Sequence, residues 1–157
     1  MDVEALIGKW WGIPGGAERA NFPLFIGDLC KALGLPEVEV SQGGTLGSYQ
    51  FEAPIAFTTA GERDSGGRID LYRRGCFVLE AKQSRLPASA QPALLPDLEA
   101  SPAAPSGARY DKLMREAFKQ AEGYARALPA EHGWPPYLIV CDVGRAFEIY
   151  FDWSGMG

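Results

Sequence analysis

The residues best suited to chemistry lie in one stretch, RIDLYRRGCFVLEAKQ, which runs from Arg68 to Gln83. Two apolar runs meet there at the letters RRG, a pattern that predicts a β-hairpin. A purely structural hairpin has no need of the carboxylates of Asp70 and Glu80 or of the ammonium group of Lys82. Two carboxylates that share a partly buried site repel one another unless a cation joins them. The stretch therefore indicates a cation site with oxygen ligands, which favour Mg²⁺ or Mn²⁺.

The alternation of strand side chains decides whether these three groups can meet. Glu80 and Lys82 are two residues apart, so they share a face of their strand. If the hairpin register pairs residues of like parity, Asp70 joins them and the apolar residues occupy the other face. The alternative is that the three charges are solvated on a sheet edge. The apolar run CFVLEAK is typical of a central strand, which weighs against that alternative.

A helix is predicted before the hairpin. Apolar residues recur with a helical period from Glu18 to Leu33. Pro23 suits only the first turn of a helix, so the helix could begin as late as Asn21 or Phe22. Glu18 would then lie just outside its N-terminus.

The other segments complete an α/β pattern. In chain order they are a strand (49–57), a turn or exposed loop (61–67), a long Pro- and Ala-rich loop (86–107), an amphipathic helix (110–128) and two final strands (136–143 and 146–153). Pro54 suits a bulge or a sheet edge within the first of these strands. The predicted order, with the hairpin included, is helix, three strands, helix, two strands.

Two motifs in this order resemble a nuclease superfamily. Asp70, nine residues and then Glu80-Ala81-Lys82 resemble the PD-(D/E)XK motif, although an isoleucine stands where that motif has its proline. Gln120 and Tyr124 on the second helix resemble the QxxxY motif of the RecB-type branch; the alternative is an ordinary i,i+4 pair with the tyrosine in the core. The resemblance implies an α-β-β-β-α-β core, with a central mixed sheet flanked by helices.

Over nearly its whole length the chain also resembles the N-terminal domain of MmeI-like, type IIL restriction-modification proteins. Besides the hairpin, the matching stretches are GGAERANFPLFIGDLCKALG, KQAEGYARAL and PYLIVCDVGRAFEIY. In that family one polypeptide holds a nuclease, an adenine methyltransferase and a target-recognition region. The resemblance implies a single nuclease-like domain, 1–157, that cleaves double-stranded DNA and is the N-terminal fragment of a larger methyltransferase. Related methyltransferases of phage-defence systems have similar N-terminal segments, so either kind of system fits.

The resemblance also implies roles for individual residues. Asp70, Glu80 and the main-chain carbonyl of Ala81 would hold Mg²⁺ or Mn²⁺, and Lys82 would orient or deprotonate the attacking water. Glu18 resembles the additional acidic ligand of some relatives; an acid that simply favours the helix N-terminus is the alternative.

Further residues would position the substrate. Gln120 and Tyr124 would place the attacking water or the phosphate. Four arginines around the motif would contact the DNA backbone or else simply be solvated: Arg68, Arg73, Arg74 and Arg85.

Composition excludes several other classes. A chain of 157 residues with 46% hydrophobic content is the size of one domain, and it has neither a run of roughly 18 apolar residues nor a signal-peptide pattern. Three cysteines without CxxC spacing fit reduced thiols, so we expect a cytoplasmic protein with no membrane partner. A formal charge of -5 argues against a free-standing DNA binder.

No methyltransferase site is expected within the chain. The letters WPPY lack the polar first residue of a catalytic methyltransferase motif, and no Gly-rich cofactor loop is present. S-adenosylmethionine would therefore bind a downstream domain of the parent protein. The competing interpretation is a catalytically inactive nuclease fold that docks DNA or packs against an adenine methyltransferase, and the intact Asp70, Glu80 and Lys82 argue against it.

Overall fold

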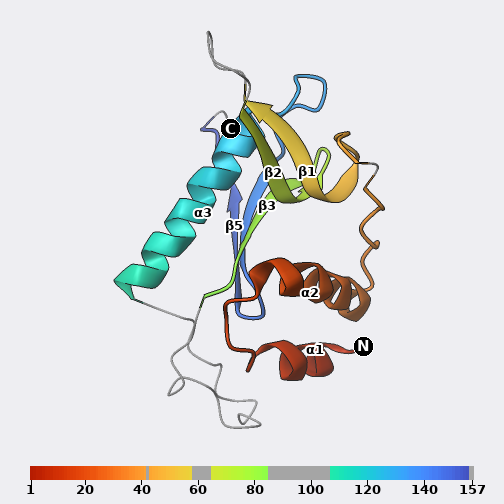
Figure 1. Cartoon of the computed structure of the whole chain (residues 1–157), viewed down its shortest axis with the longest axis vertical. Coiled ribbons are helices and arrows are strands. Elements are labelled where there is room, and N and C mark those ends of the chain that lie inside the picture. The colour runs from red at the N-terminus through yellow and green to blue at the C-terminus, as the bar shows by residue number, and fades with distance from the viewer. Residues whose placement is uncertain (42, 58–64, 85–106, 156–157) are drawn as a thin grey trace. The chain divides into compact units, whose positions relative to one another are not determined.

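A computed structural model of the chain describes residues 1–41, 43–57, 65–84 and 107–155. Its helices and strands are α1 (Val3–Trp10), α2 (Glu18–Leu33), β1 (Tyr49–Phe57), β2 (Ser65–Arg73), β3 (Phe77–Lys82), α3 (Ala108–Arg126), β4 (Tyr137–Asp142) and β5 (Ala146–Phe151) (Figure 1). The predicted loop at 86–107 lies outside the described residues except for Gly107. None of the helices in the described ranges is long and apolar enough to cross a membrane.

The chain forms two compact units. The first consists of Met1–Glu37, Ala81–Met114 and Cys141–Ala146, and the second of Val38–Glu80, Arg115–Val140 and Phe147–Gly157. The expectation of a single nuclease-like domain stays a prediction.

The strands form one mixed sheet in the order β1-β2-β3-β4-β5. β1 pairs with β2, and β2 with β3, in antiparallel fashion (Figure 1). The N–H of Tyr137 donates to the carbonyl of Cys76 at 3.3 Å, and that of Val143 donates to Lys82 at 2.8 Å. Both segments therefore advance in the same direction, which makes β3 and β4 parallel. The predicted α/β class, the mixed sheet and the central place of β3 are confirmed.

The two edge strands of the sheet differ in backbone geometry and in side-chain exposure. β1 is an edge strand, as Pro54 predicted, and it departs from regular geometry two residues earlier, at Glu52, where φ is 50°. β5 is the last strand at the other edge. Its alternate residues Phe147, Ile149 and Phe151 are 39%, 62% and 77% exposed.

The core of the second unit lies between α3 and the sheet. Ala121, Tyr124 and Ala125 of α3 form one buried cluster with sheet residues that include Tyr72 and Val78. These positions follow the apolar period that predicted the helix, although α3 ends at Arg126, two residues before the predicted end.

β2 begins at Ser65, earlier than predicted. Ser65, Gly66 and Gly67 were expected in a turn or loop but pair with β1 as part of β2. A Cβ atom on Gly67 would lie 2.7 Å from Cε1 of Tyr124 and 2.8 Å from Cε2 of Phe57. The glycine is therefore a strand residue that leaves space for two aromatic rings.

Helix α2 spans Glu18–Leu33, the residues over which the helical period was predicted, and the later start that Pro23 suggested is wrong. Gly34 caps its C-terminus with a φ of 64°, which suits glycine, and Pro23 is its sixth residue. Proline removes one backbone donor there, but burial of Phe22 and Phe25 on the apolar face stabilises the helix around it.

A short helix, α1, was not predicted. Its N-terminus is capped by Asp2, whose Oδ1 accepts from the N–H of Ala5 at 2.8 Å. The ring of Trp10 packs edge-on against Phe25 of α2, with 5.3 Å between ring centroids. The sequence signal was present, because Leu6 and Trp10 are four residues apart and follow an N-capping aspartate.

Candidate active site

The register of β2 and β3 decides which face each motif residue occupies. Leu71 pairs with Leu79, and Tyr72 pairs with Val78, so residues of like parity are opposed. The next step of this register is Asp70 and Glu80. Directly opposed residues of an antiparallel pair have their side chains on the same face. The register thus meets the condition under which the two carboxylates share a face.

Burial separates Glu80 from ordinary surface acids. Its side chain is 2% exposed, whereas Asp70 and Lys82 are half-buried. Moving a carboxylate from water into a protein interior is costly unless charges or hydrogen bonds compensate for the lost hydration. A central strand that carries such a group is consistent with a chemical role for it.

Backbone strain occurs next to Asp70. The β1–β2 register pairs Phe51 with Leu71 and Ala53 with Ile69, which places Glu52 across from Asp70. Glu52 has a left-handed φ of 50°, a conformation that costs a non-glycine residue roughly 1–3 kcal/mol. Backbone strain of this kind clusters at functional sites.

Gln83, which follows Lys82 directly, is joined to the start of α2. Its N–H donates to Oε2 of Glu18 at 2.8 Å. Its side-chain Oε1 accepts from the N–H of Ala17 at 3.1 Å and from Nδ2 of Asn21 at 3.3 Å. Glu18 is therefore the first helical residue, and its carboxylate is held at the end of the strand that carries the motif.

Ser84 is held by a buried ion pair. Its N–H and hydroxyl donate to Oδ1 and Oδ2 of Asp142 at 2.8 and 2.6 Å. Arg145 donates to the carbonyls of Ser84 and Ile13 at 2.5 and 2.9 Å. The side chains of Arg145 and Asp142 are 1% and 0% exposed, and their nearest charged atoms are 3.6 Å apart. This network fixes the chain two residues beyond Lys82.

The sequence analysis missed Gln83, Ser84, Asp142 and Arg145. One signal was available, because Asp142 ends the continuous apolar run PYLIVC, where a carboxylate is out of place unless it has a buried partner. Nothing in the local sequence identified that partner.

Gln120 and Tyr124 do contact each other on α3. Nε2 of Gln120 donates to the hydroxyl of Tyr124 at 3.0 Å. The tyrosine belongs to the same buried cluster as Ile69, the residue before Asp70 in β2. The cluster also includes Tyr72, two residues after Asp70, and Val78, two residues before Glu80 in β3. The second motif is thus packed against the hairpin that carries the first two carboxylates.

Comparison with known proteins supplies the family. The family model described as MmeI, N-terminal domain, matches residues 1–154. The chain belongs to this family. No curated protein and no solved structure matches it. The MmeI family indicates a domain of a restriction-modification enzyme, and hence part of a larger protein that acts on DNA.

A divalent cation fits the donor set of this MmeI-family domain. The described residues include no group of three or more His, Cys, Asp or Glu side chains that could hold a metal. Mg²⁺ does not need such a group, because it keeps several waters and commonly binds through one or two carboxylates. Asp70, Glu80 and a main-chain carbonyl offer only oxygen ligands, which suit this ion and Mn²⁺.

Three of the four arginines proposed as DNA contacts lie in the described chain. The guanidinium of Arg73 lies 5.1 Å from the ring centre of Tyr49. Arg74 donates to the carbonyl of Glu131 at 2.8 Å, and Arg68 donates to that of Glu52 at 3.5 Å. Arg85 lies outside the described residues.

Next to Arg74, the domain has an aromatic pair that the sequence analysis did not single out. The hydroxyl of Tyr72 lies 2.8 Å from Nδ1 of His132, and the two rings are stacked. Burial lowers the pKa of His132, and the charge of Arg74 lowers it further, against the opposing effect of Glu131. Burial raises the pKa of Tyr72. Both groups are therefore neutral at pH 7, as expected for a structural contact.

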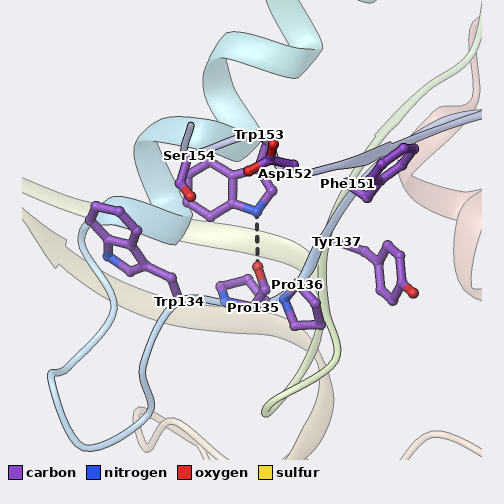
Figure 2. Close-up of a pocket in the computed structure, with 8 residues that line it drawn as sticks. All are labelled: Trp134, Pro135, Pro136, Tyr137, Phe151, Asp152, Trp153 and Ser154. Atoms are coloured by element: carbon purple, nitrogen blue, oxygen red, sulfur yellow. Dashed lines mark hydrogen bonds between the residues drawn. The ribbon is translucent and has the colours of Figure 1, made fainter. Parts of the chain in front are cut away.

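A hollow of about 350 Å³ on the second unit contains none of the motif residues. Its lining is mostly aromatic and proline: Trp134, Pro135, Pro136, Tyr137, Phe151, Asp152, Trp153 and Ser154 (Figure 2). The indole N–H of Trp153 donates to the carbonyl of Pro135 at 2.8 Å, which ties the C-terminal turn to the segment before β4 (Figure 2). The letters WPPY thus form part of a packed turn.

Proposed function

We propose that this domain is the metal-dependent DNA endonuclease of a restriction-modification or phage-defence methyltransferase. The observation that carries the proposal is the buried carboxylate of Glu80 in the central strand, which lies opposite Asp70 when the register of Leu71 and Leu79 is continued by one step. Lys82 is two residues further along the same strand. Membership of the MmeI N-terminal family supports it.

Asp70, Glu80 and the main-chain carbonyl of Ala81 would hold Mg²⁺ or Mn²⁺. Glu18, which the resemblance implies as an additional acidic ligand, does not form a group of three acids with them among the described residues, so the proposal rests on the other three groups. When bound, such a cation supplies Lewis-acid polarisation of the scissile phosphate and offsets the charge of the transition state.

Lys82 acts on the nucleophile in this proposal. Its ammonium group shares a strand face with Glu80, and in the neutral form its amine would take a proton from the attacking water. Gln120 and Tyr124 would orient the water or the phosphate through the amide and hydroxyl that bond to each other on α3. Their hydrogen bond is also compatible with a purely structural pair, so they require their own variants.

Sequence recognition is assigned to the rest of the parent protein. The formal charge of -5 leaves little electrostatic attraction for a duplex, and Arg68, Arg73 and Arg74 already make local contacts. Arg68, Arg73, Arg74 and Arg85 stay the proposed contacts to the DNA backbone. Downstream methyltransferase and target-recognition domains would supply DNA affinity, and S-adenosylmethionine would bind there. The proposed setting is the cytoplasm.

The test uses the full-length parent protein, with cleavage and methylation of the same DNA measured in parallel. Asp70→Ala, Glu80→Ala and Lys82→Ala should each abolish cleavage and leave methylation intact. Lys31→Ala, an exposed residue at the end of α2, is the control and should cleave normally. Asp70→Ala should also lose Mn²⁺ binding, whereas Lys82→Ala should keep it, because the two residues serve the cation and the water respectively.

Two results would contradict this account. Full cleavage by the Lys82→Ala protein would remove the lysine from the mechanism. A wild-type parent that methylates and binds DNA but never cleaves it would instead support the inactive docking module.

A further inference from the structure

We propose that the exposed face of β5 and the neighbouring aromatic hollow form a docking surface for the polypeptide that follows this domain in its parent protein. This β5 surface comprises Phe147, Ile149 and Phe151 together with the residues that line the hollow. It lies entirely in the second unit. The proposal rests on membership of the MmeI N-terminal family and does not require that the domain cleave DNA.

The two faces of β5 differ in what covers them. The ring of Tyr150 packs against Phe118 of α3, with 4.4 Å between ring centroids. Because strand side chains alternate, Phe147, Ile149 and Phe151 lie on the face that α3 does not cover. They are 39%, 62% and 77% exposed. Single exposed apolar residues are common on proteins, whereas a contiguous set such as this one marks an interaction site.

The hollow continues this face beyond the end of β5. Phe151 belongs to both, and its ring lies near that of Tyr137 at one end of the hollow (Figure 2). Tyr137 is itself 43% exposed. The lining residues, as the structure describes them, include Asp152 but no lysine or arginine, so the hollow is unsuited to the phosphate backbone of DNA. Apolar side chains are the occupants that fit it.

The walls of the hollow are fixed by contacts within the second unit. The rings of Trp134 and Trp153 lie 5.5 Å apart, and the guanidinium of Arg126 lies 5.1 and 5.4 Å from their centres. The indole N–H of Trp153 also donates to the carbonyl of Pro135. A site that already has its bound shape costs less to occupy, because fewer side chains must be ordered on binding.

The course of the chain favours the downstream polypeptide as the occupant. The matching family model is that of an N-terminal domain, and its match ends at residue 154, within the lining of the hollow. There the N–H of Gly155 donates to the carbonyl of Asp152 at 3.1 Å, which closes a tight turn. A turn of this kind reverses the direction of a chain and so delivers the downstream polypeptide to the β5 surface. Because that polypeptide is tethered beside the surface, its effective concentration far exceeds that of a second copy in dilute solution.

The experiment measures how fast a maleimide labels single introduced cysteines in the full-length parent protein. Ile149→Cys reports on the β5 surface, and Leu24→Cys on α2 is the matched control, since both residues are 62% exposed in the domain. Peptide mass spectrometry distinguishes these thiols from native ones, and each rate is divided by that of the same cysteine in urea. The normalised rate for Ile149→Cys should be at least about tenfold lower, because its thiol reacts only when the covering segment opens.

A second pair of variants disrupts the proposed contact. Phe151→Glu places a charge in it, which should restore the labelling of Ile149→Cys to the control rate. The same substitution should make limited proteolysis directly after the domain at least about tenfold faster. Leu24→Glu introduces an equal charge elsewhere and should leave both the labelling of Ile149→Cys and the proteolysis unchanged.

Three results would overturn the inference. Equal normalised rates at residues 24 and 149 would show that the β5 surface is uncovered in the parent. Protection of Ile149→Cys that grows with protein concentration would assign the surface to a second copy, and protection that appears only with duplex DNA would assign it to DNA. By contrast, a parent that protects Ile149→Cys at every concentration but never cleaves DNA would contradict the proposed function and support this inference.

Discussion

The two ends of β3 can be compared residue by residue. At the turn end, Val78 and Leu79 pair with β2 and are buried among apolar side chains. At the other end, the backbone from Lys82 to Ser84 is held largely by ionisable side chains, among them the fully buried Asp142 and Arg145.

The difference shows that directional hydrogen bonds hold the Lys82–Ser84 end of β3, whereas burial of apolar side chains holds the turn end. Apolar packing is non-directional and tolerates small shifts of the backbone. Hydrogen bonds to charged groups fix individual donors and acceptors, but they require charges to be taken out of water. In β3 as the structure describes it, the protein accepts that cost at the end that carries Glu80, Ala81 and Lys82, where a shift would move the proposed ligands.

Asp142→Ala should have the largest effect on the difference between the two ends of β3. Removing one partner of a buried ion pair leaves the other charge uncompensated, which typically lowers the free energy of unfolding by about 3–5 kcal/mol. Urea denaturation measures the loss. Asp142→Asn is the matched control, because an amide oxygen can still accept from Ser84, and it should cost less. A negligible loss of stability in Asp142→Asn would mean that the charge of Asp142 is unimportant at this end of the strand.

At the turn end, Tyr72→Phe should have a smaller effect. It removes the hydroxyl that lies 2.8 Å from His132 but keeps the fully buried ring. Loss of one such hydrogen bond typically lowers the free energy of unfolding by about 0.5–1.5 kcal/mol. A loss comparable to that of Asp142→Ala, measured in the same denaturant series, would remove the proposed difference between the two ends.

The smallest expected effect is a pH dependence that arises from His132. Its pKa in the folded protein is lowered by burial and by Arg74. The unfolded chain then binds the proton more readily, so stability falls as pH drops below about 6.5, the ordinary value for histidine, toward the lowered pKa. His132→Gln should flatten the unfolding free energy between pH 8 and pH 5.5. If the free energy of unfolding of the wild type rises as the pH is lowered from 8 to 5.5, the predicted direction of the pH dependence is wrong.

Local patterns predicted most of the elements. The run YQFEAPIAF forms a strand with the predicted bounds, Tyr49–Phe57, and the helical period beginning at Glu18 marks α2. Errors arose where a contact distant in sequence overrides a local preference. Pro23 suggested a late helix start, but Gln83 holds the first turn from 66 residues away. Gly67 suggested a loop, but in the structure it is a strand residue whose missing side chain leaves space for the ring of Tyr124.

In the candidate site, too, local features were predictable from the sequence and contacts between distant residues were not. Strand alternation, a local property, predicted that Asp70 and Glu80 share a face if the hairpin register pairs residues of like parity. The pairs Leu71–Leu79 and Tyr72–Val78 meet that condition. The partners of Ser84 were not predictable, since Asp142 and Arg145 are 58 and 61 residues away and no periodicity links them to it. The proposed cation, the roles of Gln120 and Tyr124 and the downstream domains stay predictions.

The exposed apolar side chains at alternate positions of β5 have a practical consequence for handling the protein. Within the described part of the chain, β5 is the last strand of the sheet and has no further strand on its outer edge, where Phe147, Ile149 and Phe151 are exposed. Such an edge readily accepts an additional strand from another molecule, which leads to aggregation. Repulsion between copies with a formal charge of -5 opposes this, but it is screened beyond about 8–10 Å at physiological salt. Dilute, low-salt buffers at neutral pH should therefore keep the purified chain in solution, and concentrated saline or acidic buffers should precipitate it.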